Sequence, residues 1–224
     1  MSIAENIAQA CAQAGRSPEE ITLVGASKMN DAAACREAIA AGIDALGENR
    51  VQEMTAKLAA NAYDGAPLHF IGHLQRNKVK QVVGKVALIQ SVGSMELLEE
   101  IEKVAAREQL VQDILLEVNI GREEAKSGSD PDAVTAAAEA ALSLPHVRVR
   151  GLMTIPPADA DRDANMRYFQ EVQALYVDIN TKLFHNELKC LSMGMSGDYM
   201  DAIRCGATMV RVGTAIFGAR NYNI

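Results

Sequence analysis

The chain has 224 residues, of which 49% are apolar, and its formal net charge at pH 7 is −7. This length suits one large α/β barrel or two small domains, and the apolar content is sufficient for a sizeable core. The acidic balance disfavours nucleic acid and membrane surfaces as partners through bulk electrostatics.

The cysteines and the termini point to a cytoplasmic setting. The four cysteines form no CxxC pair and no Cys/His metal spacing, a pattern typical of reduced structural thiols. The first ten residues lack the basic and apolar regions of a secretory signal. No stretch approaches the roughly 18 apolar residues of a membrane span. We therefore expect a cytoplasmic protein with no bound metal.

The first predicted element is an amphipathic helix over residues 2–15, with Ile3, Ile7 and Cys11 at helical spacing and Gly15 as its stop signal. Apolar strands and amphipathic helices then alternate along the chain. We expect strands at 21–26, 44–47, 68–72, 86–90, 113–119, 147–153, 188–193 and 208–212. We expect helices at 31–41, 50–60, 94–107, 131–142, 161–185 and 198–205, one more ending near 83, and a last helical turn from 213 to about 218.

Eight short β-then-α units predict a single (β/α)8 TIM barrel over residues 1–224, preceded by an extra N-terminal helix. The strands are apolar throughout, as expected for parallel strands that are buried on both faces. The alternative is a doubly wound open sheet. That fold usually has fewer strands and a glycine-rich phosphate loop after the first strand, and no GxGxxG occurs here.

Lys28 follows the first predicted strand, an unusual position for a charged residue. Desolvation at such a position would favour a neutral amine. In a barrel the carboxyl ends of the strands form the working face, and closure makes the eighth strand a neighbour of the first. Asn49 and Ser196 would then approach Lys28 from the second and seventh strands. The alternative interpretation is a strand that simply ends at the solvent.

The loops after the seventh and eighth strands have the composition of a phosphate site. Glycines allow backbone N–H groups to approach an anion, and Ser196 and Thr214 add hydroxyl donors beside Gly213. Either loop alone is better explained as an ordinary turn with a helix N-cap. Together with Lys28 they predict a site for a phosphorylated aldehyde, of which pyridoxal 5'-phosphate is the commonest that proteins hold through lysine.

Seven stretches in order resemble the pyridoxal phosphate homeostasis protein family over nearly the whole chain. They are LVGASK, GENRVQE, HFIGHLQRNK, EVNIGREEAKSG, RGLMTIP, LSMGMSGDYMDAI and MVRVGTAIFGAR. The resemblance implies that Lys28 carries the cofactor as a Schiff base and that Ser196, Gly213 and Thr214 hold its phosphate. It also implies that Asn49 and Met195 line the ring.

The same resemblance implies that Arg211 faces the pyridine nitrogen, as in the fold-type III enzymes of the alanine racemase class. Arginine stays protonated and donates a hydrogen bond, which leaves the ring nitrogen unprotonated and the ring a weaker electron sink. This favours holding the cofactor over broad amino-acid chemistry.

The function expected is therefore reversible holding and delivery of pyridoxal 5'-phosphate, with apo-enzymes as recipients, no dedicated catalytic residue and a monomeric state. Racemases of this class take a second acid/base from an additional domain, and this chain ends soon after its eighth strand. A fold-type III amino-acid racemase is the alternative. A sugar-phosphate aldolase with Lys28 as the imine lysine is a weaker one.

Three further residues are weighed against plainer roles. His73 follows the third strand on the working face, where a solvated rim histidine is the default. His69 lies within that strand and is expected to pack or to make a structural hydrogen bond. Lys126, in the loop after the fifth strand, is expected to be a solvated lysine, with contact to an anion as the alternative.

Overall fold

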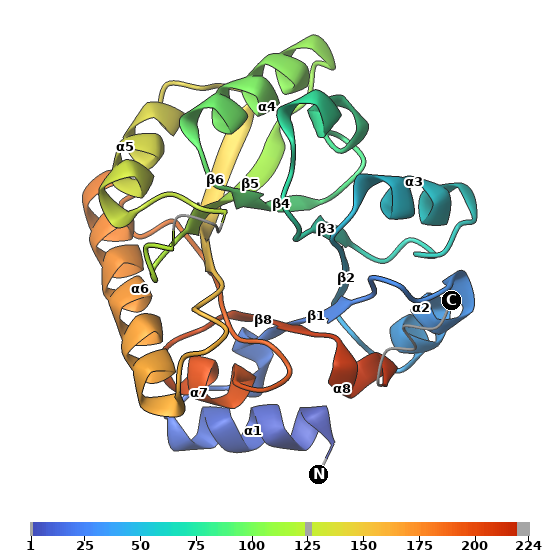
Figure 1. Cartoon of the computed structure of the whole chain (residues 1–224), viewed down its shortest axis with the longest axis vertical. Helices are drawn as coiled ribbons and strands as arrows, with labels where there is room; N and C mark the ends of the chain where they lie inside the picture. Colours follow the sequence, from blue (N-terminus) through green and yellow to red (C-terminus); the bar gives the residue numbers. More distant parts are fainter. Residues whose placement is uncertain (1, 124–126, 219–224) are drawn as a thin grey trace.

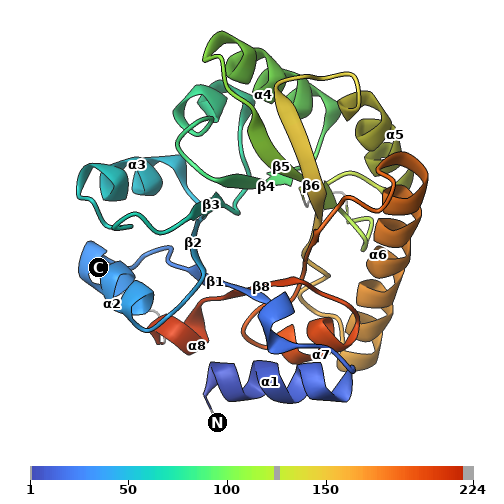
Figure 2. The same cartoon turned by 180° about the vertical axis from the view of Figure 1, so that it is seen from behind.

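The computed structural model describes residues 2–123 and 127–218, which form a closed parallel barrel inside a ring of helices (Figures 1 and 2). The strands follow one another around the barrel in chain order, and the last closes the cylinder against the first. Their bounds are β1 Thr22–Ala26, β2 Ala45–Glu48, β3 Leu68–Phe70, β4 Leu88–Val92, β5 Gln112–Val118, β6 Val147–Thr154, β7 Cys190–Ser192 and β8 Met209–Val212. The predicted (β/α)8 fold is confirmed.

Helices connect the strands on the outside of the barrel. They are α1 Ile3–Gln13, α2 Ala32–Ala40, α3 Val51–Ala59, α4 Met95–Arg107, α5 Pro131–Ala141, α6 Arg162–Leu183, α7 Tyr199–Arg204 and α8 Thr214–Phe217. Most begin at a side chain that accepts the N–H three residues ahead, and these caps are Ser2, Asp31, Ser94, Asp130 and Asp161. Each cap fixes the residue at which its helix begins, and so limits the length of the loop that precedes the helix.

The connection after β3 differs from the helix that was expected there. It is a 3-10 segment, η2, over Arg76–Gln81. A shorter 3-10 turn, η1, covers Pro18–Glu20 before β1. The η2 region carries buried Val79, Val82 and Val83 in close succession, and β-branched side chains lower helix propensity. The tighter winding still directs these valines into the core.

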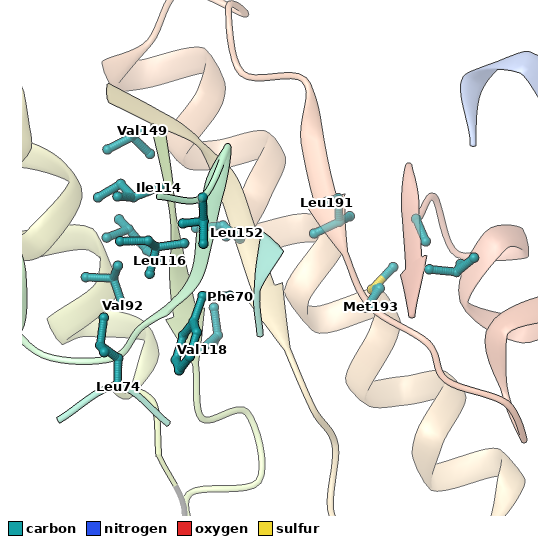
Figure 3. Close-up of a cluster of buried hydrophobic side chains, with 14 of the residues drawn as sticks. Phe70, Leu74, Val92, Ile114, Leu116, Val118, Val149, Leu152, Leu191 and Met193 are labelled. Atoms are coloured by element: carbon teal, nitrogen blue, oxygen red, sulfur yellow. The ribbon is translucent and has the colours of Figure 1, made fainter. Parts of the chain in front are cut away.

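The core has two parts, because successive strand residues point to opposite faces. On β5, Ile114 and Leu116 belong to the large cluster between strands and helices, whereas Leu115 points into the barrel. Figure 3 shows part of the large cluster, with Phe70, Val149, Leu152 and Leu191 among its members. Inside the barrel lies a small apolar layer made of Val24, Ala45, Leu88, Leu115, Met153 and Met209. This layer lies below the carboxyl ends of the strands.

The strand pairings are uneven around the cylinder. β5 and β6 are registered from Gln112↔Val147 to Val118↔Thr154, with one irregularity. β7 and β8 share the single registered pair Ser192↔Met209. Further backbone bonds join the two segments beyond it, including Arg211 N–H to the Gly194 carbonyl at 3.0 Å. The loops that follow these two strands are therefore close together.

Helix α1 lies outside the barrel against α7 (Figures 1 and 2). Its buried face consists of Ile7, Ala10 and Cys11. The Arg16 guanidinium donates to the carbonyls of Ile203 and Ala207 at 3.1 and 2.7 Å, where α7 ends. The N-terminal helix thus covers α7, the short helix between β7 and β8.

No helix within 2–123 and 127–218 is both long and apolar enough to cross a membrane.

Candidate functional site

Four consecutive strands of the closed barrel, β7, β8, β1 and β2, bring the predicted site residues to one sector of the working face. Lys28 follows β1, and Asn49 follows β2. Arg211 lies within β8, and its registered partner on the neighbouring strand β1 is Val24. The sequence argument that closure would join these strand ends agrees with the pairing of β1 and β8.

The loops after β7 and β8 are joined by a direct hydrogen bond. The Gly213 N–H donates to Ser196 Oγ at 3.2 Å. Because Ser196 Oγ accepts this bond, its own hydrogen can point elsewhere. Thr214 is the first residue of α8 and is exposed. The hydroxyl groups of Ser196 and Thr214 form a set of neutral donors suited to an oxyanion.

The β7 loop is shaped by Gly194 and Asp198. Gly194 has φ +92°, and a Cβ there would lie 2.6 Å from the Ala202 Cβ, so both the conformation and the space require glycine. The Asp198 carboxylate accepts the Met195 N–H at 2.6 Å. These contacts leave the Met195 side chain 39% exposed, on the surface rather than in the core.

Arg211 is buried inside the barrel, with only 3% of its surface exposed. Its Nη1 donates to Ser192 Oγ at 2.5 Å, and its Nη2 donates to the Thr154 carbonyl at 2.8 Å. Burial lowers the pKa of Arg211 to about 10, although the carboxylates of Glu117 and Asp198 oppose this. The guanidinium therefore stays protonated at neutral pH.

The contacts of Arg211 continue as a chain of hydrogen bonds across the barrel. Ser192 Oγ donates to Gln90 Oε1 at 2.7 Å, and Gln90 Nε2 lies 2.9 Å from His69 Nδ1. Burial lowers the pKa of His69 to about 4, so the ring is neutral and Nδ1 accepts from the Gln90 amide. The expected structural role of His69 is confirmed, while Ser192 and Gln90 were not predicted.

Asn49 is held by a close approach of the chain. A Cβ on Gly72 would lie 2.2 Å from the Asn49 carbonyl oxygen, so only glycine fits beside it. The side-chain Oδ1 of Asn49 is buried and has no hydrogen-bond partner among the described residues. An unsatisfied buried acceptor is costly, and it is a polar atom that a bound ligand can satisfy.

Lys28 is half-buried between Ser27, which is fully buried, and the exposed Met29. Ser27 Oγ donates to Glu48 Oε1 at 2.6 Å, and Lys57 Nζ donates to the same oxygen at 2.6 Å. The charged groups beneath this turn were missed from the sequence. One signal could have revealed Glu48, namely a carboxylate that closes the buried strand 45–48, whereas the i,i+4 spacing of Glu53 and Lys57 is that of an ordinary surface pair.

A second group of polar residues lines a cleft of about 470 Å³ at the ends of β3 to β5. His73 lies at its exposed rim, as expected of a solvated histidine. Glu117 is buried in its wall, where Ser127 Oγ donates to Glu117 Oε1 at 2.7 Å. Burial raises the pKa of the Glu117 carboxyl. Lys126 lies outside the described residues, so its predicted role stays a prediction.

Among the described residues, no group of three or more His, Cys, Asp or Glu side chains has metal-binding geometry. The donor set near Lys28 instead fits a ligand that carries an aldehyde and an anionic phosphate. Lys28 follows β1, which pairs with β8, the loops after β7 and β8 carry neutral donors, and Arg211 is buried within β8. The sequence prediction and the observed geometry therefore agree on which strand ends share this sector.

Comparisons with known proteins give the family. The model described as alanine racemase, N-terminal domain, matches residues 1–221. The pyridoxal phosphate homeostasis protein of Aquifex aeolicus (strain VF5) is 43% identical over 220 residues, covering 98% of this chain and 96% of the relative. The structure of PipY from Synechococcus elongatus PCC7942 with PLP bound has TM-score 0.83 and 34% identity, and covers 97% of this chain and 100% of PipY.

A more distant likeness concerns the fold alone. Alanine racemase of Clostridium difficile 630 has TM-score 0.74 and 16% identity, and the match covers 98% of this chain but 56% of the racemase. The racemase therefore contains much additional chain beyond the shared barrel. By its full-length sequence matches, this chain belongs to the alanine racemase N-terminal domain family and, within it, to the pyridoxal phosphate homeostasis proteins.

Proposed function

We propose that this protein binds pyridoxal 5'-phosphate reversibly through Lys28 and acts in cofactor homeostasis, holding the cofactor and delivering it to apo-enzymes. The observation that supports this most directly is the hydrogen bond between Gly213 and Ser196. It joins the loops after β8 and β7 next to the strand end that bears Lys28. The names of the relatives support the same function, as does the ligand of PipY.

Each site residue has a role that follows from its chemistry. The bound cofactor supplies an aldehyde that condenses with a primary amine. Lys28 provides the amine. Ser196, Gly213 and Thr214 hold the phosphate with neutral donors, and Asn49 and Met195 line the ring.

Arg211 donates to the ring nitrogen from inside the barrel. Its guanidinium has five N–H donors, and among the described residues two hydrogen bonds, to Ser192 and Thr154, hold it in place. Since an arginine cannot give up its proton at neutral pH, the nitrogen stays unprotonated and the ring remains a weak electron sink. This favours storage over catalysis.

The setting and the organisation are part of the proposal. The protein acts in the cytoplasm as a monomer, with residues 1–224 as one domain. The thiols support a reducing compartment, because Cys11, Cys35, Cys190 and Cys205 are all free. Recipient proteins are apo-enzymes that require the same cofactor.

A titration of the purified protein with pyridoxal 5'-phosphate tests the role of Lys28. We expect a new absorbance band in the wild type, covalent trapping on the Lys28 peptide after borohydride reduction, and loss of both in Lys28→Ala. Lys182→Ala is the matched control, because Lys182 is an exposed lysine on α6 paired with Asp178. A band that persists in Lys28→Ala, with trapping elsewhere, would contradict the proposal.

The same preparation separates holding from catalysis. Loaded protein should activate an apo-enzyme, and alanine in deuterated water should exchange its Cα hydrogen no faster than with free cofactor. Rapid exchange with interconversion of enantiomers would instead identify a racemase.

A further inference from the structure

The turn that carries Lys28 is held on both sides by one group of buried and partly buried polar residues. We call Ser27, Glu48, Glu53 and Lys57 the anchoring cluster. On the side before Lys28, the Ser27 carbonyl accepts from Lys57 Nζ at 2.7 Å. On the side after it, the Met29 N–H donates to Glu53 Oε1. The two peptide groups that flank Lys28 are thus both tied to the cluster.

Lys57 is the centre of this cluster and uses all of its donors within it. Its ammonium has three hydrogens. They reach the Ser27 carbonyl, Glu48 Oε1 at 2.6 Å and Glu53 Oε1 at 2.9 Å. Burial acts to lower the pKa of Lys57, but the bonds to Glu48 and Glu53 outweigh it and raise the pKa. Lys57 is therefore an ammonium and not a competing nucleophile beside Lys28.

The backbone shows why the turn needs external support. Met29 has φ +64°, a left-handed conformation that is costly for a residue with a Cβ. Its side chain is 53% exposed, so it gains no compensating burial. The Glu53 carboxylate stabilises this conformation by accepting the Met29 N–H.

Stability alone is a weak explanation for such a cluster. Buried ion pairs contribute little net stability, because desolvation offsets their attraction, and their best-supported benefit is a defined geometry. Here the geometry that is defined belongs to the backbone on either side of Lys28. The hydrogen bonds therefore fix the backbone from which the Lys28 side chain projects.

We propose that the anchoring cluster positions Lys28, setting the direction from which its amine meets an aldehyde that the loops after β7 and β8 hold. Glu48, Glu53 and Lys57 are positioning residues in this scheme, since they touch the turn and not the ligand. The inference rests on the proposed function, in which Lys28 is the attacking amine.

Glu53 offers the sharpest test, because its side chain is 21% exposed and tolerates replacement better than Glu48 or Lys57. Glu53→Met keeps the side-chain length and removes the acceptor for the Met29 N–H. Glu53→Gln keeps an acceptor oxygen and is the rescue variant. Stopped-flow absorbance gives the rate of bond formation with pyridoxal 5'-phosphate. Equilibrium binding of 4'-deoxypyridoxine 5'-phosphate, which lacks the aldehyde, reports on the phosphate-binding loops alone.

We expect Glu53→Met to slow bond formation about tenfold, the value of one charge-assisted hydrogen bond. Glu53→Gln should recover most of the rate, and both variants should bind the deoxy analogue within about twofold of wild type. Leu98→Ala, a core change on α4, should lower thermal stability while leaving the rate unchanged.

Two outcomes would overturn the inference. Unchanged rates in Glu53→Met would show that Lys28 needs no anchoring. Parallel losses of rate and of analogue binding, matched by Leu98→Ala, would show a general effect of instability. A wild type that forms no bond at Lys28 would instead refute the proposed function, so the two failures are distinguishable.

Discussion

At the scale of single residues, the hydrogen bonds inside the barrel are directed by the guanidinium of Arg211, a group that can only donate. Arg211 has no acceptor atom, so Ser192 must accept from it and pass its own hydrogen to Gln90. Gln90 then presents its amide N–H to His69. The direction of every bond, and the tautomer of His69, follow from the charge of Arg211.

The neutral state of His69 predicts a loss of stability in acid. The unfolded chain takes up a proton near pH 6.5, whereas the folded protein resists protonation until about pH 4. Stability is therefore complete above pH 6.5 and falls as the pH drops through this window, by up to about 3 kcal/mol. Urea unfolding of wild type and His69→Asn at several pH values measures this, because Asn keeps an acceptor for Gln90.

The wild-type advantage over His69→Asn should shrink between pH 6.5 and 4. The exposed His185, changed to Asn, is the control and should follow the wild-type curve. Parallel curves for wild type and His69→Asn would contradict a buried neutral histidine.

Sequence alone could identify some of these residues and not others. That Lys28, Ser196 and Gly213 follow neighbouring strands was predictable, because eight β/α units are typical of a closed barrel, which joins the eighth strand to the first. Lys57 was not identifiable, because a lysine four residues after Glu53 on a helix reads as an ordinary surface pair. Only the packing of α3 against the turn after β1 shows that this lysine is 7% exposed.

At the scale of elements, the working face depends on how closely strand ends approach one another. The end of β3 passes the end of β2 so tightly that Gly72 contacts the backbone of Asn49. The short length of β3, which spans only Leu68–Phe70, is consistent with this close approach of the two strand ends. Such a contact joins residues 23 positions apart, so hydrophobic periodicity within either strand carries no trace of it.

Gly72→Ala should therefore disturb the site through the backbone. The new methyl group has to displace Asn49, which should cost about 1–3 kcal/mol of folding free energy and weaken cofactor binding. Thermal unfolding and the absorbance titration measure the two effects. Gly197→Ala is the control, because a Cβ there meets nothing within 4 Å. Equal behaviour of the two variants would disprove the close approach.

The 3-10 segment η2 marks the limit of element prediction here. Its hydrophobic spacing is compatible with an α-helix, and the sequence therefore predicts a helix here. The difference between the two windings depends on the preferences of consecutive valines and on the space beside α3 and α4. The second factor exists only once the fold is assembled.

At the scale of the whole molecule, the start of the chain supports its end. Helix α1 and Arg16 pack on α7, which precedes β8 and the loop that carries Gly213. The expected extra N-terminal helix was predictable from its apolar spacing, but its place against α7 was not. That place depends on tertiary contacts with α7, such as the hydrogen bond from Asn6 Nδ2 to the Tyr199 hydroxyl at 2.8 Å.

Arg16→Ala should accordingly destabilise the whole protein. The change leaves the carbonyls of Ile203 and Ala207 without their charged donor, at a cost of about 1.5–3 kcal/mol. Urea unfolding measures the loss. Arg162→Ala removes an ion pair to Asp201 whose arginine is 74% exposed, and should cost less than about 1 kcal/mol. A larger loss from Arg162→Ala would reverse this ranking.

β7 and β8 share a single registered pair, and further backbone hydrogen bonds, including Arg211 N–H to the Gly194 carbonyl, join the segments that follow. The hydrogen bond from Gly213 N–H to Ser196 Oγ joins the two loops that follow, and an anion bound by both loops would strengthen this contact. A ligand that binds only the folded protein raises its stability, so occupancy of these loops and resistance to unfolding would be coupled by mass action.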